Sequence, residues 1–564
     1  MLHPAFIAFL AWLPLTLCNP APDEQIPLTL PQLTVPIAVK VEKIGFNNAR
    51  LQEAVTQALS SNQVFGVLNE SDHRVLRVDF SESSSNCNGK VVSPESFKAE
   101  VYDYTNGRAV YLNGDVFSPS SSVSLEETGT QPLPSAEEVA EAARIAGYST
   151  EAIVFAAMPP VIPRTFSNGT SHRVLHIMAR EKDEKTTKQF YVNLSNKTVE
   201  INPHSSSSAE SAAPTCHAPV EAGQSVTPRG TPGQALVTIS QGDTILWTME
   251  ITRPSASSGN AGSGVELRNV RYKGRVVLYQ AHVPILNVEY KQSVPGCGPT
   301  YRDWQNEEYP LTCPGVDVPG VPGFRICTAP PTTIVDPPNN DGGDFKGVAI
   351  YADQSTRTVV IKSQLRAGWY RYTSEWRLAV DGTLSPRFGF GGVYWPSSGC
   401  ICVPHHHHVY WRLDFDIETS QGNKVTEVNR FLSFPPGSPG QITRNDIVYE
   451  VQRPRSPLIP RRHWEVSNIQ TGRSYGLYPG SGDGKADAYG VGDLWVLKYR
   501  GTPEEVDDGV VADTGAHISK FVNSESVLDA DVVVWYAAHF LHDESHEAPG
   551  GSHIVGPTIR PIRW

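Results

Sequence analysis

Short strand-like runs separated by Gly/Pro turns fill the chain from about residue 230 to the C-terminus, where helical periodicity is almost absent. The 564 residues include 46 Gly and 45 Pro, a balance that favours strands and turns over helices. Many short strands with turn residues between them are typical of two packed sheets. We therefore predict a mainly β protein with α+β parts, in which residues 236–564 form one large β-sandwich domain.

The N-terminal part of the chain has a different pattern. Residues 1–18 are a short apolar run with the shape of a secretory signal peptide. Strand-like runs follow in residues 19–125, and residues 126–203 combine three strands with a helix predicted over 135–147. We predict that these two ranges are small α/β domains. The Ser-rich residues 204–235 are predicted to be a linker.

Several features indicate a secreted, extracellular glycoprotein with disulfide bonds. Besides the signal peptide, the chain has eight cysteines and four N-glycosylation sequons, at Asn69, Asn168, Asn193 and Asn196. A membrane-spanning helix needs roughly 20 apolar residues, and no run here is that long, so we expect no membrane span. The net charge of -12 argues against a nucleic-acid partner and is compatible with a small cationic ligand.

A run of four histidines, residues 405–408, opens the most informative segment. Along a strand, alternate residues share a face, so His405 and His407 belong to the largely apolar face that continues to Ile417. Two neutral imidazoles side by side on a buried face suit a transition metal such as copper or zinc. Parity alone leaves His406 and His408 as a competing pair.

Two carboxylates follow on the other face of the same strand. Asp414 and Asp416 alternate with the apolar positions and would form a separate site made of oxygen ligands. Such ligands suit calcium, magnesium or manganese.

This segment resembles that of copper amine oxidases, in which His-x-His precedes an Arg-Leu-Asp-x-Asp strand. In the family the Arg lies five residues after the second His, so Arg412 selects His407, and with it His405, as copper ligands. The resemblance implies a third copper ligand seven residues after the Trp of an Asp-(hydrophobic)3-Trp strand. Here that strand is residues 531–535, and the ligand is His542.

The resemblance also implies a second divalent metal, calcium or manganese, and a homodimer. The second metal would be held by three carboxylates and two backbone carbonyls, from Asp414, Asp416, Asp531, Phe415 and Val532. Residues 265–281 are similar to the segment that opens the family's catalytic domain, and residues 556–564 resemble its C-terminal tail.

Family members oxidise primary amines with topaquinone, a cofactor made from a Tyr in an Asn-Tyr-Asp/Glu motif. The matching Tyr is Tyr370, but its neighbours are Trp369 and Arg371. A bulky indole would change how freely the Tyr ring rotates, and an Arg favours an anionic neighbour. Tyr290 matches a family Tyr that contacts the quinone.

The family base that removes a proton from the amine substrate can be matched to this sequence in three alignments. Alignment on Tyr309 puts Gln305 at the base position, where a glutamine cannot act as a base. A shift of two residues recovers Asp303, and counting from Tyr290 reaches Trp304. We take Asp303 as the predicted base.

These observations predict a copper-dependent primary amine oxidase that converts a small primary amine to an aldehyde, consuming oxygen and releasing ammonia and hydrogen peroxide. The alternative is a copper-binding member of the same fold that lacks the quinone and acts as a binding protein or catalyses another reaction. Cys400 and Cys402 precede the histidines and have two possible uses, disulfide pairing or metal ligation.

Overall fold

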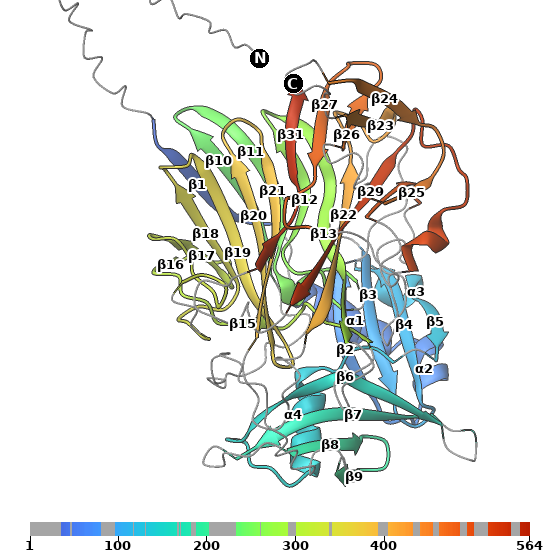
Figure 1. Cartoon of the computed structure of the whole chain (residues 1–564). Coiled ribbons are helices and arrows are strands. Elements are labelled where there is room, and N and C mark those ends of the chain that lie inside the picture. The colour runs from blue at the N-terminus through green and yellow to red at the C-terminus, as the bar shows by residue number, and fades with distance from the viewer. Residues whose placement is uncertain are drawn as a thin grey trace, which may run out of the picture. The chain divides into compact units, whose positions relative to one another are not determined.

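The computed structural model describes twelve main stretches of the chain (Figure 1): residues 35–44, 48–80, 96–129, 131–165, 169–181, 188–201, 233–290, 300–337, 341–392, 404–431, 440–454 and 462–564. Within these stretches, residues 117, 170 and 260 are not described, nor are residues 485–492, 501–516 and 543–552. The predicted signal peptide, most of the predicted linker, Asn168, Cys400 and Cys402 lie outside the described residues.

One large antiparallel sheet contains ten strands, and its centre is formed by β13, β22 and β29 (Figure 1). Its strands, in spatial order, are β1 (Ile37–Lys43), β10 (Gln234–Gln241), β11 (Thr244–Thr252), β12 (Glu266–Tyr272), β13 (Arg275–Tyr290), β22 (His405–Phe415), β29 (Val532–His542), β28 (Leu494–Lys498) and β25 (Val451–Arg453), with β14 (Thr300–Arg302) beside β13.

The second large sheet contains thirteen strands. Its strands, in spatial order, are β16 (Gly315–Asp317), β17 (Phe324–Cys327), β18 (Val348–Asp353), β19 (Thr358–Ala367), β20 (Tyr370–Ala379), β21 (Leu384–Gly392), β31 (Thr558–Arg563), β27 (Ser474–Tyr478), β26 (His463–Asn468), β23 (Asn423–Arg430) and β24 (Ile442–Ile447), with β15 (Glu308–Tyr309) beside β19 and β30 (His553–Val555) beside β21.

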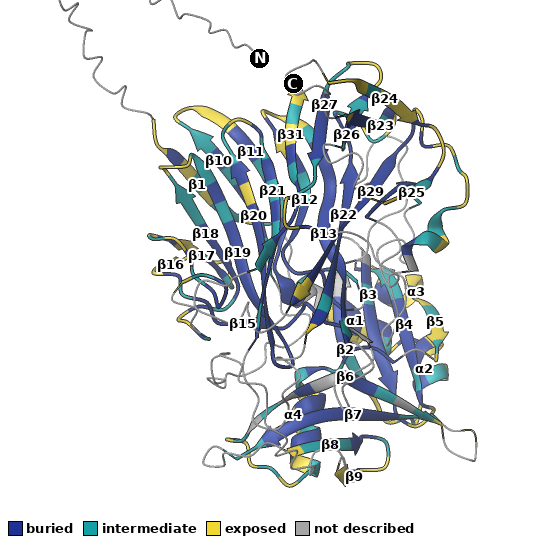
Figure 2. Ribbon diagram, in the orientation of Figure 1, coloured by how far each residue is buried: buried dark blue, intermediate teal, exposed yellow. Residues whose placement is uncertain are grey.

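The two sheets pack face to face over one apolar core, and their central strands are largely buried (Figure 2). Two tryptophan side chains hydrogen-bond across this core. Trp247 of the ten-stranded sheet donates to the carbonyl of Ala379 at 2.8 Å, and Trp376 of the thirteen-stranded sheet donates to the carbonyl of Val265 at 2.8 Å. Buried indole N–H groups need such acceptors. The prediction of a large C-terminal β-sandwich is confirmed.

Two four-stranded sheets lie between β1 and β10 in the chain. The first contains β2 (His73–Phe80), β3 (Ser96–Asp103), β4 (Arg108–Asp115) and β5 (Ser124–Thr128), with helices α1 (Asn48–Leu59), α2 (Asn62–Leu68) and α3 (Pro119–Ser122). The second contains β6 (Ile153–Thr165), β7 (Ser171–Arg180), β8 (Lys188–Asn193) and β9 (Thr198–Ile201), with helix α4 (Ala136–Ile145).

Helix α4 begins where its sequence predicts. The side chain of Ser135 accepts a hydrogen bond from the backbone N–H of Glu138, whose carboxylate in turn accepts from the backbone N–H of Ser135. This capping box satisfies two N–H groups that lack partners within the helix. The predicted helix over residues 135–147 is confirmed.

Strand β1 belongs to the large sheet, although it falls within the range predicted as the first small domain. All seven of its residues pair with β10 in antiparallel register, from Ile37 opposite Gln241 to Lys43 opposite Ala235. Its alternate side chains therefore add to the apolar core of the sandwich.

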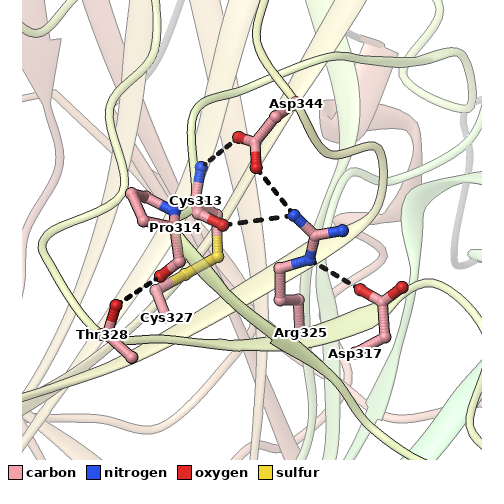
Figure 3. The surroundings of a disulfide bond; sticks show 7 residues. All are labelled: Cys313, Pro314, Asp317, Arg325, Cys327, Thr328 and Asp344. Carbon is pink, nitrogen blue, oxygen red and sulfur yellow. Dashed lines mark hydrogen bonds and ion pairs between the residues drawn. A yellow bond between two sulfur atoms is a disulfide. The ribbon is translucent and has the colours of Figure 1, made fainter.

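A disulfide bond joins Cys313 to Cys327, the last residue of β17, close to the edge strand β16 (Figure 3). Arg325 lies beside it and donates to the carbonyl of Cys313 and to the carboxylate of Asp344, at 3.3 and 2.8 Å. The same carboxylate accepts from the backbone N–H of Cys313 at 2.8 Å. The prediction that some cysteines form disulfides is confirmed for this pair.

None of the helices in the described residues is long and apolar enough to cross a membrane. Two short 3-10 helices, Pro254–Ala256 and His517–Phe521, complete the regular structure described.

Candidate metal centre

Three histidines converge at the paired ends of β22 and β29. His405 and His542 are direct partners in the register of the two strands, so their side chains lie on the same face, and His407 lies two residues along. The three rings are buried, and each offers a nitrogen within 4.8 Å of the others. Nδ1 of His542 is 3.2 Å from Nε2 of His405.

His407 is the clearest sign that this group suits a metal ion. Within the described part of the chain, neither of its ring nitrogens has a hydrogen-bond partner, although the side chain is fully buried. Burial, and then the neighbouring ring of His405, hold the pKa of His407 well below its usual range. The ring is therefore neutral and keeps a lone pair that can bind a metal.

The structure separates the two histidine pairs that strand parity had left open. His405 and His407 meet His542, whereas His408 contacts His539 on the other face of the strands, at 2.8 Å between Nδ1 atoms. His406 is partly exposed.

Tyr370 reaches the histidines from the thirteen-stranded sheet. Its phenol oxygen is 2.9 Å from Nε2 of His405, and its ring centroid is 5.0 Å from that of His407. The phenol oxygen of Tyr290 also hydrogen-bonds to that of Tyr370, and the ring of Tyr290 stacks on His405 at 4.9 Å. Burial, and then proximity to Tyr290, raise the pKa of Tyr370 well above its usual value.

Asp303 is linked to Tyr370 through the side chain of Tyr372. The phenol of Tyr372 donates a hydrogen bond to its carboxylate, and the ring of Tyr372 stacks on Tyr370 with centroids 5.6 Å apart. Burial raises the pKa of Asp303 to about 8, although the hydrogen bond from Tyr372 opposes the rise. This carboxyl group can therefore gain and lose a proton near neutral pH.

The side chains of the other two candidates for the base, Gln305 and Trp304, form hydrogen bonds to other groups. The amide of Gln305 donates to the backbone carbonyl of Val283 at 2.5 Å. The indole of Trp304 donates to Glu307 at 3.3 Å. Of the three alignments, the one that selects Asp303 places a carboxyl group against Tyr372, whose ring stacks on Tyr370.

The two residues that flank Tyr370 have different surroundings. The ring centroid of Trp369 lies 6.0 Å from that of Tyr370. Arg371 points away from Tyr370, as strand alternation requires, and forms two hydrogen bonds to Asp341, at 2.7 and 3.1 Å. Its guanidinium also lies 4.0 Å from the ring centroid of Tyr309. The expectation that Arg371 has an anionic neighbour is therefore met by Asp341.

Sequence reasoning missed Tyr372 and Asp341. Tyr372 could have been predicted from the sequence, because it follows Tyr370 by two residues in β20 and so must lie on the same face of the strand. Asp341 lies 30 residues before Arg371 in a segment between strands, and no local pattern predicts that pairing.

Three carboxylates form a second group at the far ends of β22 and β29. Asp414, Asp416 and Asp531 are buried, and each offers an oxygen within 4.8 Å of the others. The two residues expected to contribute backbone carbonyls, Phe415 and Val532, are direct partners in the strand register. All the predicted residues of this second site therefore lie together.

No model of a known protein family matches this sequence, and no curated protein sequence matches it either. Solved structures do match. A copper-containing benzylamine oxidase from Hansenula polymorpha has a TM-score of 0.55 at 13% identity, over 90% of this chain and 96% of that one. The lysyl oxidase of Pichia pastoris has a TM-score of 0.54 at 13% identity, over 96% of this chain and 91% of that one. The chain therefore has the fold of these copper amine oxidases.

Proposed function

We propose that this protein is a copper-dependent primary amine oxidase. It would convert a small primary amine, oxygen and water into an aldehyde, ammonia and hydrogen peroxide. The observation that carries the proposal is the buried histidine triad with the phenol of Tyr370 at 2.9 Å from His405.

Copper fits the triad, and His405, His407 and His542 would hold it. Three neutral imidazole nitrogens suit copper, and the buried nitrogens of His407 otherwise lack hydrogen-bond partners among the described residues. Bound copper and oxygen would supply the oxidation of the Tyr370 ring to topaquinone, which takes two electrons from an amine. The similarity in fold to the two oxidases supports the same metal.

In this proposal Asp303 acts as the base. Its carboxylate would accept the proton from the carbon next to the amine nitrogen, and Tyr372 would hold that carboxylate beside the ring of residue 370. Tyr290 would fix the ring from the other side through its phenol. All these groups are buried, which would shield the site from bulk solvent.

Four further features belong to the proposal. The group of Asp414, Asp416 and Asp531 would hold calcium or manganese, because all its ligands are oxygen atoms. The protein would be secreted and glycosylated, as the N-terminal apolar run and the sequons suggest, and it would form a homodimer.

The test is phenylhydrazine titration of the copper-loaded, aerated protein, read by visible absorbance and by the mass of the peptide that contains Tyr370. A coloured adduct on that peptide is expected, and the Tyr370→Phe variant should give none. An unmodified Tyr370 at full copper occupancy would overturn the oxidase proposal.

That negative result would favour the alternative, a copper-binding protein without the quinone. One observation favours this alternative specifically. The Tyr370 ring is fully buried between Trp369 and Tyr372, with centroid distances of 6.0 and 5.6 Å, which restricts its rotation.

A further inference from the structure

Tyr370 is the first residue of β20, at the end of the paired part of the strand. Its two register partners, Ala367 and Gly392, are the last residues of β19 and β21. Strand pairing therefore supports Tyr370 from its C-terminal side only, and strand ends open more readily than strand centres. On its N-terminal side the chain passes through the two-residue turn Gly368–Trp369. The position of the Tyr370 ring at the metal centre thus depends on what holds this turn.

The turn places the indole of Trp369 against Tyr370, with ring centroids 6.0 Å apart. It begins at Gly368, whose φ of 59° is a left-handed conformation that glycine adopts without strain. Nη1 of Arg371 donates hydrogen bonds to the backbone carbonyls of Gly368 and Tyr370, each at 3.3 Å. One guanidinium nitrogen therefore binds the backbone on both sides of Trp369.

The rest of the guanidinium faces Asp341, which lies between β17 and β18 in the chain. Nε and Nη2 of Arg371 donate to the two carboxylate oxygens at 2.7 and 3.1 Å, a paired contact that is both strong and directional. The phenol of Tyr309 donates to the same carboxylate at 3.2 Å, and its ring centroid lies 4.0 Å from the guanidinium. Arg371 thus ties the turn to a segment outside the hairpin of β19 and β20.

This arrangement needs a side chain with hydrogen-bond donors in two directions. A Lys has one ammonium group, which cannot form the paired contact with Asp341 while it also bonds both carbonyls. An ionised Asp or Glu has no donor and would be repelled by Asp341. Among charged side chains, the anchor is therefore specific to Arg.

We propose that Arg371 is a positioning residue for Tyr370. Its guanidinium anchors the turn to Asp341 and keeps Trp369 against the Tyr370 ring. The phenol of Tyr370 is thereby held beside His405, where the proposed oxidation would take place. The effect on quinone formation rests on the proposed function, whereas the anchor itself can be measured without metal.

The first test is hydrogen–deuterium exchange of the metal-free, full-length protein, read in the peptide that covers residues 366–372. Arg371→Lys should speed amide exchange in this peptide by a factor of about 10 or more, as expected when two hydrogen bonds of ordinary strength are lost. Arg371→Met/Asp341→Leu should have the same effect. The double variant leaves no buried charge unpaired, so it serves if the Lys variant does not fold.

The matched control is Thr373→Val, on the same face of β20. It removes a hydrogen bond to Thr333 at 2.9 Å and leaves the bonds of Arg371 in place, so exchange in the peptide should stay at the wild-type rate. Wild-type exchange in both Arg371 variants would overturn the proposal. Equally fast exchange in Thr373→Val would also overturn it, since the turn would then respond to any loosening of the sheet.

The second test measures how fast the quinone forms after copper is added to the aerated protein, read by absorbance of the phenylhydrazine adduct. Arg371→Lys should form it about 10 to 100 times more slowly than wild type at equal copper content, because a misplaced ring reacts slowly. Thr373→Val should form it at the wild-type rate. Faster exchange in Arg371→Lys with quinone formation at the wild-type rate would overturn the positioning role. A wild type without quinone would overturn the oxidase proposal, and the exchange rates would still decide the anchor.

Discussion

The phenol oxygen of Tyr370 lies 2.9 Å from Nε2 of His405, and the two residues belong to different sheets of the sandwich. The histidine triad belongs to the ten-stranded sheet alone, and the packing of the thirteen-stranded sheet brings Tyr370 to it. The hydrogen bonds of Trp247 and Trp376 across the same core help to fix this distance. The chemistry proposed at Tyr370 would thus depend on how the two sheets pack as well as on local residues.

Replacing Asp303 by Asn should lower kcat/KM for a primary amine by a factor of about 100 to 10,000, the usual contribution of a general base. Reaction of the copper-loaded variant with phenylhydrazine should persist, because cofactor formation does not need this base. The control is Gln305→Met, whose side chain faces a backbone carbonyl and should leave kcat/KM nearly unchanged. Equal losses in both variants would contradict the assignment of Asp303.

The free energy of unfolding should depend on pH through Asp303. Burial raises its pKa to about 8, so the folded protein binds more protons than the unfolded chain between about pH 4 and about pH 8. Stability from this group is fully present below about pH 4 and falls as the pH rises, by up to about 1.4 kcal/mol per pH unit. Asp303→Asn should lack this component.

Chemical denaturation of the metal-free wild type and Asp303→Asn variant at several pH values measures this contribution of Asp303 to the free energy of unfolding. The difference in unfolding free energy, wild type minus variant, should decline across the window. A difference that stays constant would mean that Asp303 is ionised throughout.

Arg371→Met should destabilise the protein by about 3–5 kcal/mol, because it leaves the Asp341 carboxylate buried without its cation. The double variant Arg371→Met/Asp341→Leu should lose less than the sum of the two single variants, as denaturation of all four proteins would reveal. Arg377→Met is the control on the same strand. Its guanidinium is half-exposed, and its buried partner Glu375 keeps a second ion pair with Lys362, so the loss should be less than about 1 kcal/mol.

The described sequons should differ in glycosylation when the protein is made in a eukaryotic secretory host. Asn69 and Asn196 are exposed and should carry glycans. The side-chain nitrogen of Asn193 is buried 2.9 Å from Nδ1 of His172, and its oxygen accepts from the backbone N–H of Ser195, so it should remain unmodified. Peptide masses after enzymatic glycan removal measure each site, and a glycan on Asn193 would contradict this reading.

Sequence patterns predicted the elements that depend on local chemistry. The cap at Ser135 and the alternation along β22 follow from neighbouring residues alone. The full set of metal ligands was predicted from the resemblance to copper amine oxidases, since strand parity alone left two histidine pairs open. The structure brings those residues together because the two strands pair in register. The choice between Asp303 and Gln305 depended instead on which side chain faces Tyr372. No pattern within one segment contains that information.

The pairing of β1 with β10 has a consequence for synthesis of the chain. Both four-stranded sheets lie between these strands in sequence, so β1 leaves the ribosome long before its partner exists. During that interval β1 is an edge without a neighbour, which other nascent chains can pair with. Pairing of β1 therefore waits until the chain of both small sheets has been made, and a chain that stalls before β10 is exposed to aggregation through its first strand.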